Sequence, residues 1–204
     1  MKKEIVLFDL CPIREGKRNA ETVCITAMSY LKEGADNEQR MEEQLLNVSE
    51  YILLRGKSNH SGLLRTVNTV SAHEMDEDAL MKLYLSLHRE YRRNAVFMMN
   101  FVTLHQLYRT IGFGNGTLLR SDSSGGFLLL NRPIVLCNSM PCPKEGDVPI
   151  LYGDFGKVHI EDCGRDALQQ EPHDDASDQM KCRMTGYLNC VLDDRQAVWG
   201  MKMV

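Results

Sequence analysis

The chain has 204 residues, of which 43% are hydrophobic and 25% are charged, and its formal net charge is -4. A chain of this length can bury a substantial core, as one large domain or two small ones. The acidic balance argues against attraction to nucleic acid through clustered Lys and Arg, although it does not exclude a protein that encloses DNA. No apolar run approaches the roughly 20 residues that span a bilayer, so we expect no membrane partner.

The cysteine pattern favours reduced thiols in a cytosol over a disulfide framework. The number of cysteines is odd, no CxxC pair occurs, and residues 1–9 do not fit a signal peptide. The seven cysteines are Cys11, Cys24, Cys137, Cys142, Cys163, Cys182 and Cys190.

The first third of the chain predicts two strands and one long helix. Residues 4–8 and 22–28 are short apolar runs typical of strands. From about 35 to 54, apolar residues recur at intervals of four, three and four, which indicates an amphipathic helix. Asp36 or Asn37 can cap its start, and Gly56 is expected to end it. The apolar positions of this helix are Met41, Leu45, Val48 and Ile52.

A second helix is predicted from about Asp76 to Tyr91. Three acidic residues, 76–78, lie at its electropositive N-terminus, and Arg89, Arg92 and Arg93 lie in or just past its last turn. Ser71–Glu74 precedes it and matches a capping box.

The central stretch opens with a short apolar run, 94–100, that fits a strand buried on both faces. Asn100 is placed to cap a following helix whose apolar stripe would be Phe101, Leu104, Leu107 and Tyr108. Three glycines within 112–116 end that helix.

Further strands are predicted along the rest of the chain. Residues 169–178 are polar and indicate a solvated loop. The expected strands are 127–130, 131–136, 149–156, 157–160, 180–192 and 196–203.

Three patterns invite a catalytic or metal-binding interpretation. Asp154–Gly156 matches the metal-binding triplet of protein kinases, but the chain lacks the accompanying kinase motifs. The glycines of 112–116 follow a helix, whereas a phosphate loop follows a strand and opens a helix. Four residues have the side-chain types of zinc ligands, namely Cys137, Cys142, His159 and Cys163. Two prolines flank Cys142, so free thiols are the simpler interpretation.

No constellation for nucleophilic catalysis emerges. Residues 123–126 form a Ser-Gly loop without the geometry of a nucleophile elbow. The histidines are scattered along the chain at His60, His73, His88, His105, His159 and His173. We therefore predict no catalytic residue, no cofactor and no metal ligand.

An ordered set of short motifs resembles the major capsid proteins of tailed bacteriophages, the family with the Hong Kong ninety-seven fold. No single motif is specific, but the order and spacing of the set, over roughly residues 22 to 204, are much more so. After the first amphipathic helix the motifs are Leu54–Lys57, Ser61–Leu64, Asn94–Asn100, Asn131–Val135, Met140–Pro141, Gly153–Phe155, Arg183–Gly186 and Ala197–Val198. Asn131 stands where the family often has glycine, and asparagine tolerates a left-handed backbone best among the alternatives.

The resemblance implies an α+β, two-lobed fold with a long spine helix in a peripheral domain and a mixed-sheet axial domain. Residues 1–57 would hold the N-terminal part of the peripheral domain with the spine helix at about 35–54, residues 58–165 the axial domain, and residues 166–204 the return to the peripheral domain. The N-terminal arm and extended loop of the family would be shortened within residues 1–34.

The resemblance also implies a structural subunit that is not an enzyme. Copies would join as pentamers and hexamers into an icosahedral phage or prophage shell enclosing double-stranded DNA, with portal and scaffold proteins as further partners. The protein would reside in the virion, and in the host bacterial cytoplasm during assembly. Two alternatives stay open: an encapsulin-like nanocompartment shell, and a small zinc- or nucleotide-binding enzyme.

Overall fold

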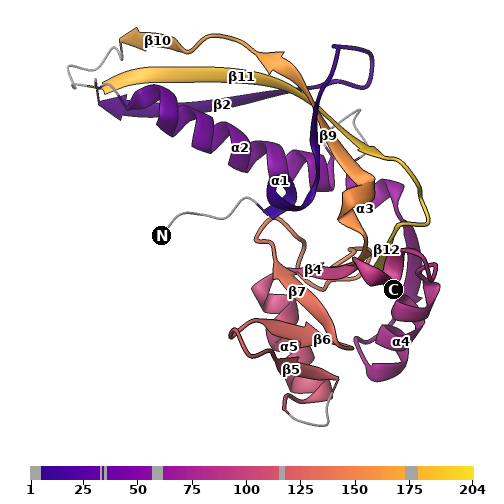
Figure 1. Cartoon of the computed structure of the whole chain (residues 1–204). Helices are drawn as coiled ribbons and strands as arrows, with labels where there is room; N and C mark the ends of the chain where they lie inside the picture. The colour runs from indigo at the N-terminus through magenta and orange to yellow at the C-terminus, as the bar shows by residue number, and fades with distance from the viewer. Residues whose placement is uncertain (1–5, 33, 35, 57–61, 115–117, 173–178) are drawn as a thin grey trace.

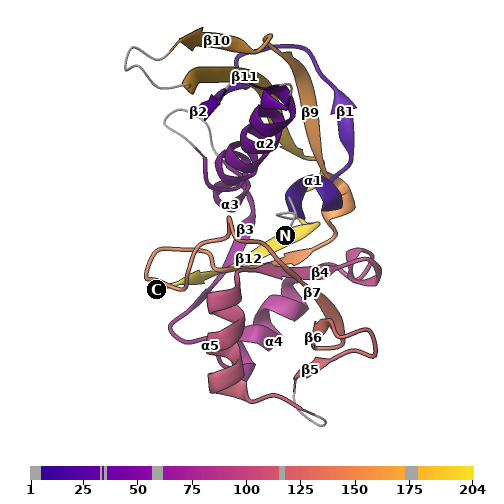
Figure 2. The same ribbon diagram turned by 90° about the vertical axis from the view of Figure 1, so that its left-hand side faces the viewer.

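The computed structural model describes residues 6–32, 34, 36–56, 62–114, 118–172 and 179–204. The fold is mixed α+β and is built on two mixed sheets, one of five strands and one of seven (Figure 1). Helix α2 accompanies the five-stranded sheet, and helices α4 and α5 lie with the seven-stranded sheet (Figures 1 and 2).

Strand β11 organises the five-stranded sheet, because it pairs antiparallel with β2 along one edge and with β9 and β10 along the other. β1 adds to β9 in parallel. The elements of this half are α1 (Val6–Leu10), β1 (Ile13–Glu15), β2 (Val23–Lys32), α2 (Asn37–Arg55), β9 (Val158–Arg165), β10 (Gln169–Pro172) and β11 (Gln179–Leu192).

Helix α2 confirms the long amphipathic helix predicted from the sequence. It packs against β2 and β11, and Met41, Leu45 and Ile52 are buried there, whereas Val48 is 37% exposed. Asp36 occupies the N-cap position without a side-chain cap bond. Gly56 ends the helix with φ 84°, a left-handed value that favours glycine.

The predicted strand at residues 4–8 is wrong for its described part, since α1 begins at Val6. Val6 and Leu7 are buried, and the Leu7 N–H donates to the carboxylate of Glu50 on α2 at 2.8 Å. A five-residue apolar run cannot be assigned to helix or strand by periodicity alone, and here packing against α2 selects the helix. Residues 4 and 5 lie outside the described part of the chain.

The seven-stranded sheet has the order β3-β12-β8-β4-β7-β6-β5, with parallel pairs β3–β12 and β4–β7. At its centre, Phe97 and Tyr152 are fully buried and stack with ring centroids 4.3 Å apart. The elements of this half are α3 (Leu63–Thr66), β3 (Asn68–Ala72), α4 (Glu77–Ser86), η1 (Tyr91–Arg93), β4 (Val96–Met99), α5 (Phe101–Ile111), β5 (Leu119–Ser121), β6 (Phe127–Leu129), β7 (Arg132–Leu136), β8 (Ile150–Gly153), η2 (Phe155–Lys157) and β12 (Val198–Met203).

Helix α4 is shorter than the predicted helix. Asp76 caps it by accepting a hydrogen bond from the Ala79 N–H at 2.8 Å, and it ends at Ser86. The Arg92 guanidinium donates to the backbone carbonyls of Leu85 and Leu87. These carbonyls at the end of the helix therefore have hydrogen-bond donors although the helix does not continue. The predicted capping box at 71–74 is also wrong, because its first two residues belong to strand β3.

Helix α5 confirms the prediction at its start and corrects it on its surface. The Asn100 side chain accepts a hydrogen bond from the Thr103 N–H at 2.7 Å, as a cap should. Leu104 and Leu107 are buried. Phe101 and Tyr108 were predicted in the same buried stripe, yet they are 61% and 54% exposed.

Two more predictions concern backbone conformation. Asn131 has φ 62°, which confirms the expected left-handed geometry. The solvated loop predicted at 169–178 is wrong for residues 169–172, because they form strand β10 against β11. Residues 173–178, and residues 115–117 of the predicted glycine turn, lie outside the described part of the chain.

The chain passes between the two sheets three times: after α2, after β8 and after β11. The second and third passages lie side by side, since the Asp193 N–H donates to the Lys157 carbonyl and the Asp154 N–H donates to the Ala197 carbonyl, both at 2.9 Å. Within the described residues, none of the helices combines the length and apolar character needed to cross a membrane.

Candidate functional site

Each of the four possible zinc ligands, Cys137, Cys142, His159 and Cys163, lies against a different neighbouring group. Cys137 is buried, its thiol lies 3.4 Å from the Glu50 carboxylate, and burial together with that carboxylate raises the pKa of the thiol to about 12. The thiol of Cys142 lies 3.5 Å from the amide nitrogen of Asn100. Cys163 faces the Thr22 hydroxyl instead.

His159 is buried between two carboxylates. Its Nδ1 lies 3.0 Å from Asp193 and its Nε2 lies 3.7 Å from Glu161. Across the described residues, no group of three or more His, Cys, Asp or Glu side chains is arranged to hold a metal ion. All seven cysteines, each of which lies in a described segment, are free thiols.

The kinase-like triplet is a turn between β8 and β9. The Asp154 carboxylate accepts a hydrogen bond from the Gly156 N–H at 3.0 Å and opens the η2 turn. The loop at 123–126 is likewise a turn, in which the Asp122 carboxylate accepts from the N–H groups of Ser124 and Gly126. The Ser124 hydroxyl also donates to this carboxylate at 2.9 Å, and this bond together with the backbone bonds lowers the pKa of Asp122. Both patterns are therefore accounted for by local backbone structure.

The best-defined buried polar site is structural and joins the two halves of the molecule. Glu50 on α2 is 5% exposed and accepts hydrogen bonds from the Leu7 N–H at 2.8 Å and from the Ser139 hydroxyl at 2.9 Å. The Arg55 side chain donates to the Ser139 carbonyl at 2.8 Å. Because Ser139 follows β7 of the other sheet, α2 is fixed to the seven-stranded half through this residue. Sequence reasoning missed this site, since Glu50 stands on the helix among other acidic residues without a distinguishing neighbour.

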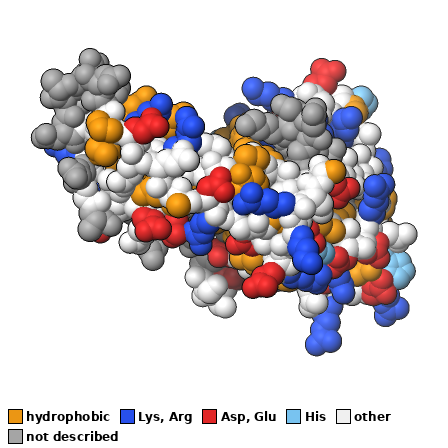
Figure 3. All heavy atoms as spheres, turned by 90° about the horizontal axis from the view of Figure 1, so that it is seen from above, with side chains coloured by type: hydrophobic (Ala, Val, Ile, Leu, Met, Phe, Trp, Pro, Cys, Tyr) orange, Lys and Arg blue, Asp and Glu red, His pale blue; other side chains and the backbone are white. Residues whose placement is uncertain are grey.

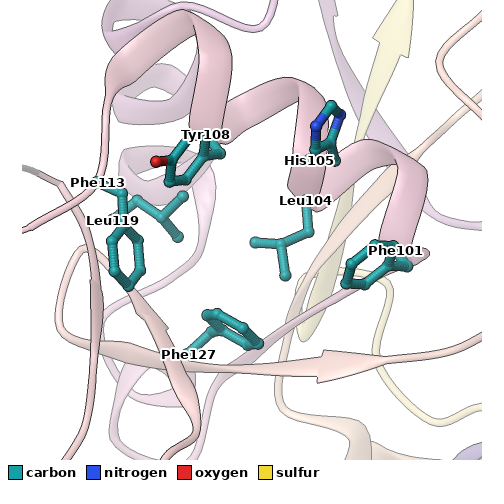
Figure 4. Close-up of a pocket in the computed structure, with 7 residues that line it drawn as sticks. All are labelled: Phe101, Leu104, His105, Tyr108, Phe113, Leu119 and Phe127. Atoms are coloured by element: carbon teal, nitrogen blue, oxygen red, sulfur yellow. The ribbon is translucent and has the colours of Figure 1, made fainter.

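The outer surfaces hold several exposed apolar side chains. On α5, Phe101 and Tyr108 flank an open cavity of about 180 Å³ whose other walls include Phe113, Leu119 and Phe127. In Figure 4, Leu104 and Tyr108 of α5 lie above Phe127 from the strand below, with Phe101 at one end of the cavity and Phe113 at the other.

Two further exposed apolar groups lie elsewhere. Met81 and Leu85 on α4 are 39% and 59% exposed, and Met28 and Tyr30 on β2 are each 52% exposed. On the face seen from above, hydrophobic side chains occur in small groups among interspersed acidic and basic ones (Figure 3). Exposed apolar groups distributed over several faces suit contacts with other protein surfaces better than a single binding pocket.

Comparison with known proteins identifies the fold. Residues 38–203 match the model of the phage capsid family. The structure is similar to the capsid of an empty GTA particle, with TM-score 0.69, 16% identity, and coverage of 99% of this chain and 91% of that chain. It is also similar to a solved chain of Gordonia phage Cozz, with TM-score 0.64, 11% identity, and coverage of 100% of this chain and 88% of that chain.

An encapsulin shares the fold too. The SrpI encapsulin of Synechococcus elongatus PCC 7942 aligns with TM-score 0.65 at 13% identity, over 98% of this chain and 88% of that chain. A comparison with curated protein sequences gives no match. The family match extends over most of the chain and agrees with the resemblance found in the sequence motifs. The chain therefore belongs to the phage capsid family, and it is a structural, non-enzymatic capsid protein of a phage-like particle.

Proposed function

We propose that copies of this chain assemble as pentamers and hexamers into an icosahedral shell that encloses double-stranded DNA. The observation that carries the proposal is the family match over residues 38–203, together with a fold similar to those of phage-like capsids. The exposed apolar side chains on α4, α5 and β2 support it, because a shell subunit needs several contact surfaces.

Sheet membership supports two domains with different roles in the shell. In this proposal α2 is the spine helix, and α1, β1, β2, α2, β9, β10 and β11 form the peripheral domain. The remaining elements form the axial domain, which gathers around the five-fold and six-fold vertices. Relative to the ranges expected from the sequence, β9 moves to the peripheral domain and β12 to the axial domain. The hydrogen bond between Glu50 and Ser139 connects the two domains.

The N-terminal residues have a specific place in this proposal. β1 and β2 are incorporated in the five-stranded sheet through β9 and β11. We propose that residues 13–32 serve as the shortened counterpart of the extended loop of the family and strengthen the peripheral domain of their own subunit.

The charge of the chain fits a DNA container. A net charge of -4 does not hold DNA by bulk attraction, so DNA at high density inside the shell would stay free to enter and leave. Assembly would take place in the host bacterial cytoplasm, with portal and scaffold proteins as further partners.

Negative-stain electron microscopy and size-exclusion chromatography of the purified protein test the assembly. Closed shells or rings of five or six subunits are the expected products. A protein that stays monomeric at high concentration, with or without added scaffold protein, would contradict the proposal.

An encapsulin-like nanocompartment is the second candidate, because the SrpI encapsulin has the same fold. The contents of particles from the native host distinguish the two. Nuclease-protected double-stranded DNA supports the phage-like shell, and a packaged cargo protein without DNA supports the nanocompartment.

A further inference from the structure

Two exposed helix surfaces lie at opposite edges of the seven-stranded sheet. Helix α4 contacts β3 and β12, at one end of the strand order, whereas α5 contacts β5 at the other end. Figures 1 and 2 show both helices beneath the sheet, and Figure 1 shows them apart from each other.

The outward ridge of α4 combines acidic and apolar residues. Glu77, Met81 and Leu85 follow one another at intervals of four, so they form one line along the helix. Met81 and Leu85 are 39% and 59% exposed. Asp78, which is also exposed, adds a second negative charge at the N-terminal end of this ridge.

The outward ridge of α5 has residues at the same spacing, but its apolar residue lies at the N-terminal end and its basic residue at the C-terminal end. Phe101, His105 and Arg109 also follow at intervals of four, and Phe101 is 61% exposed. The open cavity of about 180 Å³ lies beside this ridge, between Phe101 and Phe113 (Figure 4).

The two ridges are complementary when the helices run antiparallel. Glu77 then faces Arg109, Met81 faces His105, and Leu85 faces Phe101. In both ridges the first and last residues are eight positions apart in sequence, which is about 12 Å at the rise of an α-helix. The antiparallel arrangement also brings the positive N-terminal end of the α4 dipole to the negative C-terminal end of α5.

The charged ends of the two ridges have no ion-pair partner among the described residues. In the described part of the chain, none of Glu77, Asp78 and Arg109 takes part in an ion pair. Since the helices lie at opposite sheet edges, their ridges can meet only between two molecules.

We infer that α4 of one copy packs antiparallel on α5 of the next copy, with Leu85 against Phe101 and the rim of the cavity, and with Glu77 and Asp78 against Arg109. This contact joins two different surfaces, so it is heterologous, and such a contact closes a ring when the rotation between neighbouring copies is one fifth or one sixth of a turn, as in the proposed pentamers and hexamers. The inference rests on the proposed shell function and specifies which helix faces hold neighbouring subunits together.

Charge reversal with rescue tests the contact. The first variant carries Arg109→Glu, the second carries Glu77→Arg with Asp78→Arg, and the third combines all three changes. Like charges facing each other across an interface repel, so each of the first two variants should yield at least roughly tenfold fewer rings or shells than the parent protein. The third variant should restore assembly. All the changed side chains are exposed, and circular dichroism and melting temperature verify that each variant is folded.

Two controls make the result specific. Arg109→Lys keeps the charge and should assemble like the parent protein. Arg40→Glu, on the exposed side of α2, adds the same charge change as Arg109→Glu and should not rescue Glu77→Arg with Asp78→Arg. Rescue by Arg40→Glu would show a net-charge effect and would overturn the inference.

A photo-crosslinking amino acid in place of Leu85 identifies the neighbouring segment directly. Crosslinks between assembled chains should map by mass spectrometry to α5 or to the adjoining residues 113 and 127. Crosslinks to other segments, or failure of the triple reversal to assemble, would overturn the contact. If the parent protein itself makes no rings or shells, the proposed function fails instead, so the two failures are distinguishable.

Discussion

The Ser139 hydroxyl donates a hydrogen bond to the carboxylate of Glu50 at 2.9 Å and so connects the loop after β7 to the long helix α2. The same buried carboxylate accepts the Leu7 N–H, which ties the N-terminal helix to the same point. One acidic side chain thus holds together three segments that are far apart in sequence.

Replacing Glu50 should destabilise the whole molecule. Glu50→Ala leaves the Leu7 N–H and the Ser139 hydroxyl without their acceptor, at a cost of about 1–3 kcal/mol for the buried Leu7 N–H and less for the half-buried Ser139 hydroxyl. Glu50→Gln keeps one acceptor oxygen and should cost less. Urea unfolding measures the free energies, with Glu43→Ala on the exposed side of α2 as the control. Equal stability of the two alanine variants would contradict the structural role.

Gly153 should not tolerate a methyl group. A Cβ there would lie 2.3 Å from the Ala197 carbonyl oxygen and 2.6 Å from the Val198 Cα, both of them backbone atoms that cannot turn away. Gly153→Ala should therefore lower stability by about 1–3 kcal/mol or more, or prevent folding. Gly34→Ala, whose nearest atom would be 3.9 Å away, is the matched control. Thermal unfolding gives the melting temperatures of the two variants. A melting temperature of Gly153→Ala equal to that of the parent would contradict the close approach of β8 and β12.

The buried and the exposed cysteine thiols should differ strongly in their rates of alkylation. Burial raises the pKa of Cys11 well above its usual range and that of Cys137 to about 12, so both lack the thiolate form at pH 8 and are also inaccessible. Cys24 is exposed. Brief alkylation of native protein should label Cys24 and leave Cys11 and Cys137 unmodified until denaturant is added, as peptide mass spectrometry can measure. Labelling of Cys11 as fast as Cys24 would be inconsistent with the packing of α1.

Acid should remove the contribution of the Tyr91–Asp194 contact. The Tyr91 hydroxyl donates to Asp194 at 2.6 Å, and this bond lowers the pKa of the Asp194 carboxyl. A carboxyl with a lowered pKa in the folded state stabilises the protein above its unfolded pKa, and the effect disappears as pH falls through the folded pKa. Tyr91→Phe should therefore melt below the parent at pH 7, and the difference should shrink towards pH 2.

Tyr108→Phe is the control for that comparison, because the Tyr108 side chain is exposed and its hydroxyl has no such acidic partner among the described residues. A pH-independent difference between Tyr91→Phe and the parent would mean that the hydroxyl acts without the carboxylate.

Local chemistry made much of the fold predictable. Asn100 and Asp76 begin their helices through their own side chains, and Gly56 ends α2 through its own backbone freedom, so short segments carried enough information. The strand at 96–99 could also be predicted from the sequence, because a strand buried on both faces requires a continuous apolar run.

Tertiary contacts decided the elements that were missed or mistaken. α1 is helical where Leu7 meets Glu50, and β10 is a strand because its backbone pairs with β11, although all four of its residues are exposed and polar or proline. Phe101 looked like a core residue because apolar side chains usually mark the buried stripe. Its exposure on α5 is better explained by a role at the molecular surface.

The three passages of the chain between its sheets have a mechanical consequence. A single peptide cleavage in any one of them leaves the other two intact, so the halves stay covalently linked. The backbone hydrogen bonds of Asp154 and Asp193 also join the second and third passages to each other. Twisting one half against the other would therefore strain the hydrogen bonds that join the second and third connections, so these bonds oppose such a movement.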